Sequence, residues 1–143
     1  MRSTGPVLAL AATLATSALS GCAKVEAAVH EPHPAVEIAD GADDSAPKTL
    51  TLTADAVRRL ELTTVVVEDA ATIPYAAIVY DKKGAPWVYT NTQERTYVRV
   101  PVTVRRVTGD IAEVAAGPPR GTRVVTRAAI KLYGAENGVG GGH

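Results

Sequence analysis

The feature that most constrains the fold is a run in which valine occupies every second position from Val98 to Val104. Neighbouring side chains of a strand point to opposite faces, so this run predicts a strand with one buried and one solvated face. Pro101 lies on the solvated side of the run. Because proline has no backbone N–H to donate to a ladder, it predicts an edge strand or a bulge at that position.

The rest of residues 49–133 shows the same period of two, interrupted by turn residues. Strands are predicted over residues 49–53, 62–67, 73–80, 87–90, 98–107, 111–114 and 123–126. Thr53 is expected to cap a short helix over residues 54–60. Residues 128–133 form either a second short helix or an irregular closing segment. The pattern predicts a mainly β fold, a small antiparallel β-barrel or sandwich with one short helix.

Trp87 is the single tryptophan of the chain and falls in one of these strands. A lone tryptophan in an alternating strand is a large apolar group, and its burial stabilises one face of a sheet. The sequence therefore predicts that Trp87 is substantially buried.

The N-terminus has the pattern of an exported lipoprotein. Arg2 precedes an apolar stretch over residues 6–19, which is shorter than the roughly 20 residues of a membrane span. The sequence Leu19-Ser20-Gly21-Cys22 follows, and it resembles the lipobox of bacterial lipoproteins. That resemblance implies that Cys22 is lipidated and becomes the new N-terminus. An ordinary signal peptide with a nearby cysteine is the alternative. We expect a protein anchored by lipid at the extracytoplasmic face of the cell membrane.

These features divide the chain into four parts. They are a signal peptide (1–21), a flexible acidic linker (22–48), a β domain (49–133) and a flexible glycine-rich tail (134–143). The linker is rich in Ala, Pro, Asp and Glu, a composition that buries little apolar surface. It also contains His30 and His33, which with nearby carboxylates could bind copper or zinc. A metal-binding lipoprotein is therefore an alternative function, although no third fixed ligand accompanies the two histidines.

Charge is balanced over the whole chain but unevenly distributed. Residues 22–69 contain four basic and ten acidic residues, and residues 95–131 contain eight basic and two acidic residues. Four arginines of the later segment are candidates for binding a partner: Arg99, Arg105, Arg106 and Arg123. Arg99 and Arg105 are expected to leave the same strand face. The alternative is an ordinary solvated face. Binding of nucleic acid is not expected, because overall charge is balanced and exposed aromatic residues are few.

Catalysis is not expected either. Residues 49–133 contain no histidine, cysteine or serine, and Asp81 and Asp110 stand at predicted turns. The sequence therefore predicts no catalytic residue, metal ligand or cofactor in the β domain.

Several motifs of the β domain resemble the membrane-proximal domain of periplasmic adaptor subunits (membrane fusion proteins) of tripartite efflux pumps. They are the stretch Thr72-Ile73-Pro74-Tyr75-Ala76-Ala77-Ile78, the sequence Gly84-x-x-Trp87-Val88-Tyr89, the strand over 98–107, Gly109-Asp110, Gly117-x-x-x-Gly121-x-x-Val124-Val125 and residues 128–133. A proline at 118 replaces the leucine that usually follows the first glycine of the late turn.

In that family a lipoyl-like domain, an α-helical hairpin and a β-barrel separate the first strand–helix unit from the Ile-Pro strand. Here only a few residues around Asp69 separate them, and no heptad pattern is present. The chain thus resembles a truncated adaptor reduced to its membrane-proximal domain. The resemblance implies docking on a membrane transporter or permease. It leaves the transported substrate and the oligomeric state open.

Overall fold

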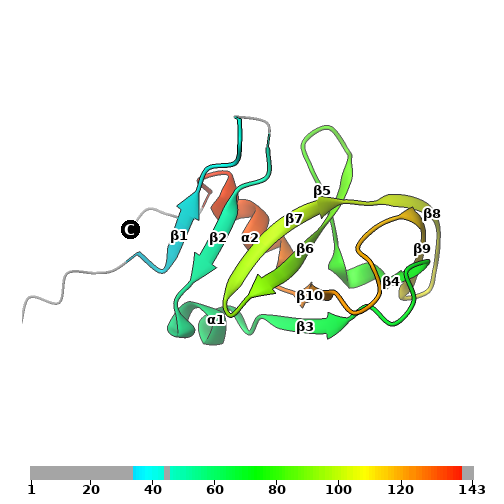
Figure 1. Cartoon of the computed structure of the whole chain (residues 1–143), viewed down its shortest axis with the longest axis horizontal. Coiled ribbons are helices and arrows are strands. Elements are labelled where there is room, and N and C mark those ends of the chain that lie inside the picture. Colours follow the sequence, from blue (N-terminus) through cyan, green and yellow to red (C-terminus); the bar gives the residue numbers. More distant parts are fainter. Residues whose placement is uncertain (1–33, 44–45, 140–143) are drawn as a thin grey trace, which may run out of the picture. The chain divides into compact units, whose positions relative to one another are not determined.

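Two antiparallel sheets form the framework of the described part of the protein (Figure 1). The computed structural model describes residues 34–43 and 46–139. The larger sheet has the strand order β1-β2-β7-β6-β10-β3, and β5 pairs with β6 beside this path. Its strands are β1 (Val36–Ala39), β2 (Thr49–Leu52), β3 (Thr63–Val66), β5 (Ile78–Tyr80), β6 (Pro86–Gln93), β7 (Thr96–Pro101) and β10 (Arg123–Arg127). The smaller sheet contains β4 (Thr72–Pro74), β8 (Thr103–Thr108) and β9 (Ile111–Ala116) in the order β4-β9-β8.

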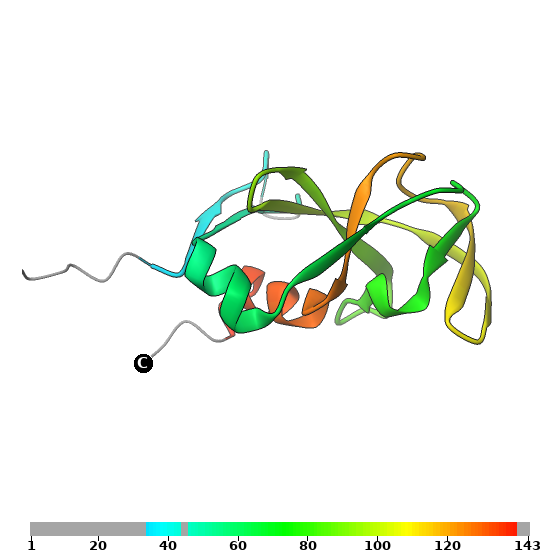
Figure 2. The same ribbon diagram turned by 90° about the horizontal axis from the view of Figure 1, so that it is seen from below.

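Helices cover one face of the larger sheet. They are α1 (Ala54–Leu60) and α2 (Ala129–Glu136), and a single 3-10 turn, η1 (Tyr75–Ala77), joins β4 to β5. Thr53 caps α1 as expected, since its hydroxyl accepts a hydrogen bond from the backbone N–H of Ala56 at 3.1 Å. The segment over 128–133, left open by the sequence, is the start of α2. Figure 2 shows both helices on the same side of the larger sheet.

The valine run does not form one continuous strand, which corrects the prediction for 98–107. The strand β7 ends at Pro101, and the chain passes to the smaller sheet as β8. Val102 joins the two strands, with its N–H donating to the carbonyl of Pro86 at 3.1 Å. Pairing of β8 with β9 shifts register on both sides of Val104. Proline cannot extend the ladder, so it marks the point at which the chain changes sheets.

Two apolar cores result, one on each face of the larger sheet. Adjacent residues of β6 belong to different cores, because Tyr89 faces the helices and Val88 faces the smaller sheet. The helix-side core consists of Leu50, Leu52, Ala56, Val79, Tyr89, Tyr97, Val125, Ala129 and Leu132. The inter-sheet core consists of Val67, Ile73, Ala77, Val88, Val102, Ala112, Val114 and Val124. The helices and the smaller sheet therefore pack against opposite faces of β6 and β10.

Two predicted boundaries are wrong. The linker over 22–48 includes β1, which pairs antiparallel with β2 and places Val36 against the helix-side core. The tail over 134–143 includes the last turn of α2, which continues through Gly134 to Glu136. In both places a few side chains that pack or bind internally compensate the entropy lost by ordering a short polar stretch.

The predicted fold class is confirmed. The chain is mainly β and antiparallel, and the sheets of its described part pack as a sandwich without closing into a barrel. Within residues 34–43 and 46–139, no helix has the length and hydropathy needed to cross a membrane.

Candidate functional site

The four arginines predicted to bind a partner do not form one surface. Arg99 lies on β7 of the larger sheet, Arg105 and Arg106 lie on β8 of the smaller sheet, and Arg123 begins β10. Because the chain changes sheets after Pro101, the expectation that Arg99 and Arg105 leave the same strand face is wrong. Arg105, Arg106 and Arg123 are exposed, and Arg106 forms an ion pair with Glu113 at 2.5 Å.

Arg99 is withdrawn from the surface and bound to Glu136. Its Nε donates to Glu136 Oε1 at 2.8 Å, and the two side chains are only 14 % and 3 % exposed. Its guanidinium lies 4.2 Å from the ring centroid of Trp87 and 6.0 Å from that of Tyr133. A guanidinium over aromatic faces gains cation–π attraction in addition to the ion pair. The arrangement makes Arg99 an internal structural residue.

The carboxylate of Glu136 is surrounded by donors from three distant segments. Besides Arg99, it accepts from the Tyr89 hydroxyl at 2.5 Å and from the backbone N–H of Lys48 at 3.2 Å. These bonds join the last turn of α2 to β6, β7 and the entrance of β2. Burial raises the pKa of the Tyr89 phenol well above its ordinary value, and the hydrogen bond to Glu136 raises this pKa further.

Trp87 is largely buried, in agreement with the prediction, although it is not one of the fully buried core residues. Its indole N–H donates to Asp81 Oδ2 at 3.1 Å. Asp81 also accepts from the backbone N–H groups of Ala85 and Lys83, at 2.9 and 2.8 Å. The hydrogen bond from Ala85 contributes most to lowering the pKa of Asp81. Tyr89, two residues later on the same face, is fully buried in the helix-side core.

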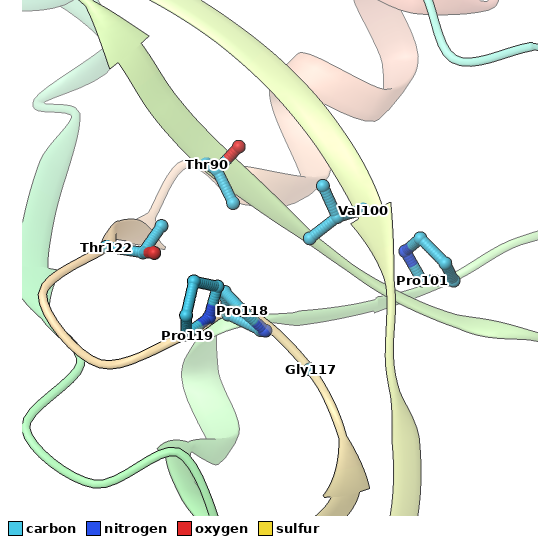
Figure 3. Close-up of a pocket in the computed structure, with 7 residues that line it drawn as sticks. All are labelled: Thr90, Val100, Pro101, Gly117, Pro118, Pro119 and Thr122. Atoms are coloured by element: carbon cyan, nitrogen blue, oxygen red, sulfur yellow. The ribbon is translucent and has the colours of Figure 1, made fainter.

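A pocket of about 430 Å³ opens between the larger sheet and the loop from β9 to β10 (Figure 3). Its lining residues are Thr90, Val100, Pro101, Gly117, Pro118, Pro119 and Thr122. None of them is charged. The Thr90 hydroxyl already donates to the carbonyl of Val98 at 3.0 Å. The pocket therefore offers apolar surface and little polar chemistry, which suits side chains of a partner better than a reactive substrate.

Sequence reasoning missed both Glu136 and this pocket. Glu136 had a detectable signal, because Ala129, Leu132 and Tyr133 recur with it at the spacing of one helix face. The pocket had none, since its residues come from three separate segments.

The other predicted site residues are not described by the structure. Cys22, His30 and His33 all precede residue 34, where the described chain begins. Within the described ranges, no group of three or more His, Cys, Asp or Glu side chains could hold a metal ion.

Comparisons of the chain with protein-family models, with curated proteins and with solved structures found no match.

Proposed function

We propose that this protein is a membrane-anchored extracytoplasmic lipoprotein, in which a truncated adaptor-like domain docks on a membrane transporter and modulates it. Lipid on Cys22 supplies the anchor, and the β domain supplies the docking surface. Two or three acyl chains on one residue are sufficient for stable anchoring, since each buried methylene contributes about 0.8 kcal/mol.

The observation that carries the proposal is how the two halves of the chain share one sheet. The early strand β2 pairs with β7, and the early strand β3 pairs with β10. Only residues 67–71 connect β3 to β4. In the adaptor family the corresponding halves are separated by three intervening domains. The shared sheet supports a membrane-proximal module that folds without those domains.

The side-chain chemistry of the described residues favours docking over catalysis. Glu136 is the one buried carboxylate of this part of the chain, and its oxygens accept from three internal donors. A general acid or base needs access to a substrate, which this carboxylate lacks. The pocket and the exposed strand edges remain available to a protein partner.

The test separates anchoring from docking. The full chain and a Cys22→Ser variant are expressed in a bacterium, and membranes are washed with high salt. We expect the wild-type chain in the washed membrane fraction and the variant in the soluble extracytoplasmic fraction. Retention of the variant on washed membranes contradicts lipid anchoring through Cys22.

Docking is measured on the anchored wild-type chain by cross-linking in intact cells and purification in mild detergent. We expect one transporter to be recovered in stoichiometric amount. A chain with the same signal peptide and linker but an unrelated folded domain is the control. Equal recovery of the transporter with both chains contradicts docking by the β domain.

A further inference from the structure

The strand β3 is a short edge of the larger sheet, and its one register shift against β10 places the extra residue in β10. Its sequence, Thr63-Thr64-Val65-Val66, contains no charge and no proline. Exposed edges normally carry charged residues, prolines or bulges, because unpaired backbone groups are a template for strand addition. Figure 1 shows β3 at the margin of its sheet.

Three other described edge strands carry a charge or a proline. The strand β8 carries Arg105 and Arg106. The opposite edge of the larger sheet, β1, carries the exposed Glu37, and β4 ends in Pro74. This contrast gives Arg105 and Arg106 a simple explanation, since they protect an edge. It also distinguishes β3 from these three strands.

The backbone direction of β3 follows from its neighbour in the chain. Val67 uses both of its backbone groups toward the segment before β10, because its N–H donates to Thr122 and its carbonyl accepts from Gly121, each at 2.8 Å. Hydrogen-bonding direction alternates along a strand, so the groups of Thr64 and Val66 point away from β10. Two N–H and two C=O groups are thus presented at the free edge.

Exposed apolar side chains flank those groups on both faces. Val65 is 36 % exposed and Val66 is 44 % exposed, and adjacent strand residues face opposite sides. An added strand would cover both valines while satisfying the backbone groups between them. Only an extended polypeptide segment meets both requirements.

Charge distinguishes between possible occupants. Glu68 and Asp69 follow β3, both are exposed, and neither has a cationic partner within residues 34–43 and 46–139. Antiparallel pairing of two β3 strands that matches Thr64 with Val66 would bring Asp69 beside Glu61 of the second copy, which is already ion-paired with Arg127. A second copy therefore fits less well than a segment with basic residues that pair with Glu68 and Asp69.

We propose that β3 accepts an extended, uncharged, β-branched segment of the transporter, with basic residues beside Glu68 and Asp69. This inference rests on the proposed docking function and names the contact through which docking occurs. A four-residue strand pair is weak by itself. Anchoring both proteins in one membrane raises their effective concentration enough for such a contact to form.

The first test uses two capped peptides and the mature chain without lipid. One peptide is Lys-Arg-Thr-Val-Thr-Val-Thr, and the other has Glu-Glu in place of Lys-Arg. Titration is followed by NMR amide shifts and hydrogen exchange. We expect the basic peptide to shift and protect the amides of Thr64 and Val66, with at least tenfold weaker binding of the acidic peptide. Perturbation centred on other strands, or equal binding of both peptides, overturns the proposal.

A matched pair of variants tests the backbone contact. Val66→Pro removes an N–H that β10 does not use, whereas Val66→Thr keeps the N–H and the side-chain shape. We expect at least tenfold weaker peptide binding for V66P and unchanged binding for V66T. Should V66P fail to fold, Val66→Lys replaces it, with Thr51→Lys on the internal strand β2 as its control. Equal binding within the matched pair contradicts strand addition.

Transporter recovery distinguishes this inference from the proposed function. If folded V66P and V66T both recover the transporter as fully as the wild-type chain does, the β3 contact is overturned and docking itself is not. Failure of the wild-type chain to recover any transporter overturns both. Concentration-dependent dimerisation of the wild-type chain that V66P abolishes assigns β3 to self-association and likewise overturns the proposal.

Discussion

At the scale of single residues, Glu136 connects more of the molecule than any other described side chain. Its carboxylate binds Arg99, Tyr89 and the backbone of Lys48, which lie 37, 47 and 88 residues before it in the sequence. A buried carboxylate is costly unless it is paired and hydrogen-bonded, and here all of its partners are internal. The ion pair therefore couples the last turn of α2 to the sheet.

Replacing Arg99 by methionine should destabilise the protein by about 3–5 kcal/mol, because a buried carboxylate loses its countercharge. Arg105→Met removes the same group from an exposed position and should change the free energy of unfolding by less than about 0.5 kcal/mol. Urea unfolding measures both. Trp87 is the only tryptophan and lies against Arg99, so its fluorescence should change in the first variant alone. Equal stability of the two variants contradicts a structural ion pair.

Tyr89 should make stability depend on alkaline pH. Burial raises its pKa in the folded protein above the unfolded value of about 10. The contribution of Tyr89 to the free energy of unfolding is therefore complete below pH 10. It is lost as pH rises further, by up to about 1.4 kcal/mol per pH unit. We expect the wild-type chain to be more stable than Tyr89→Phe at pH 8, with the difference shrinking above pH 10. A pH-independent difference in urea unfolding from pH 8 to 11.5 would refute this assignment.

At the scale of elements, the loop from β9 to β10 determines both the pocket wall and the start of β10. Gly121 has φ +89° and binds Val67 through its N–H. Gly117, at the other end of the loop, has a φ that any residue adopts, and an added Cβ would lie 3.4 Å from Val114 Cγ2 and 3.5 Å from Val102 Cγ1. Adding a side chain should therefore change the free energy of unfolding differently at the two glycines.

Gly121→Ala should destabilise the protein by about 1–2 kcal/mol, because an L-residue is strained at this φ. Gly117→Ala should be neutral or stabilising by up to about 1 kcal/mol, since the added methyl makes ordinary contacts and restricts the unfolded chain. Thermal or urea unfolding of the two variants gives the comparison. Equal losses would show that the conformation of Gly121 is not what the loop requires.

At the scale of the whole molecule, the folded region extends beyond both ends predicted from the sequence. The strand β1 precedes the expected start at residue 49, and α2 continues past the expected end at residue 133. Both additions contact the helix-side core or its polar margin. The proposed tether would thus enter the fold at β1.

A chain that ends after Tyr133 should be less stable than one that ends after Val139. The shorter chain lacks Glu136, so the largely buried Arg99 loses its carboxylate partner, at a cost of about 3 kcal/mol or more. In a domain of this size that loss lowers Tm by more than about 12 °C. Differential scanning calorimetry of the two chains measures it. Equal Tm values would show that the folded domain ends at residue 133, as the sequence predicted.

Much of this architecture was readable from local pattern. Alternating valines indicate a strand, Thr53 indicates the start of a helix, and glycines indicate chain reversals. Each of these signals acts on residues close to it in the sequence, so the mainly β class and most elements were predictable. The assignment of Cys22 as the lipid-attachment residue and the resemblance to adaptors likewise rest on short sequence motifs. The function inferred from them is a proposal.

The tertiary structure alone decided which side chains meet. Arg99 and Arg105 look equivalent in the valine run, yet Arg99 is largely buried against Glu136 and Arg105 is exposed on a different sheet. The difference arises because the chain changes sheets after Pro101, and because a carboxylate 37 residues away completes the environment of Arg99. Ion pairing, pocket walls and free strand edges depend on contacts between distant segments, and local periodicity contains no information about which segments become neighbours.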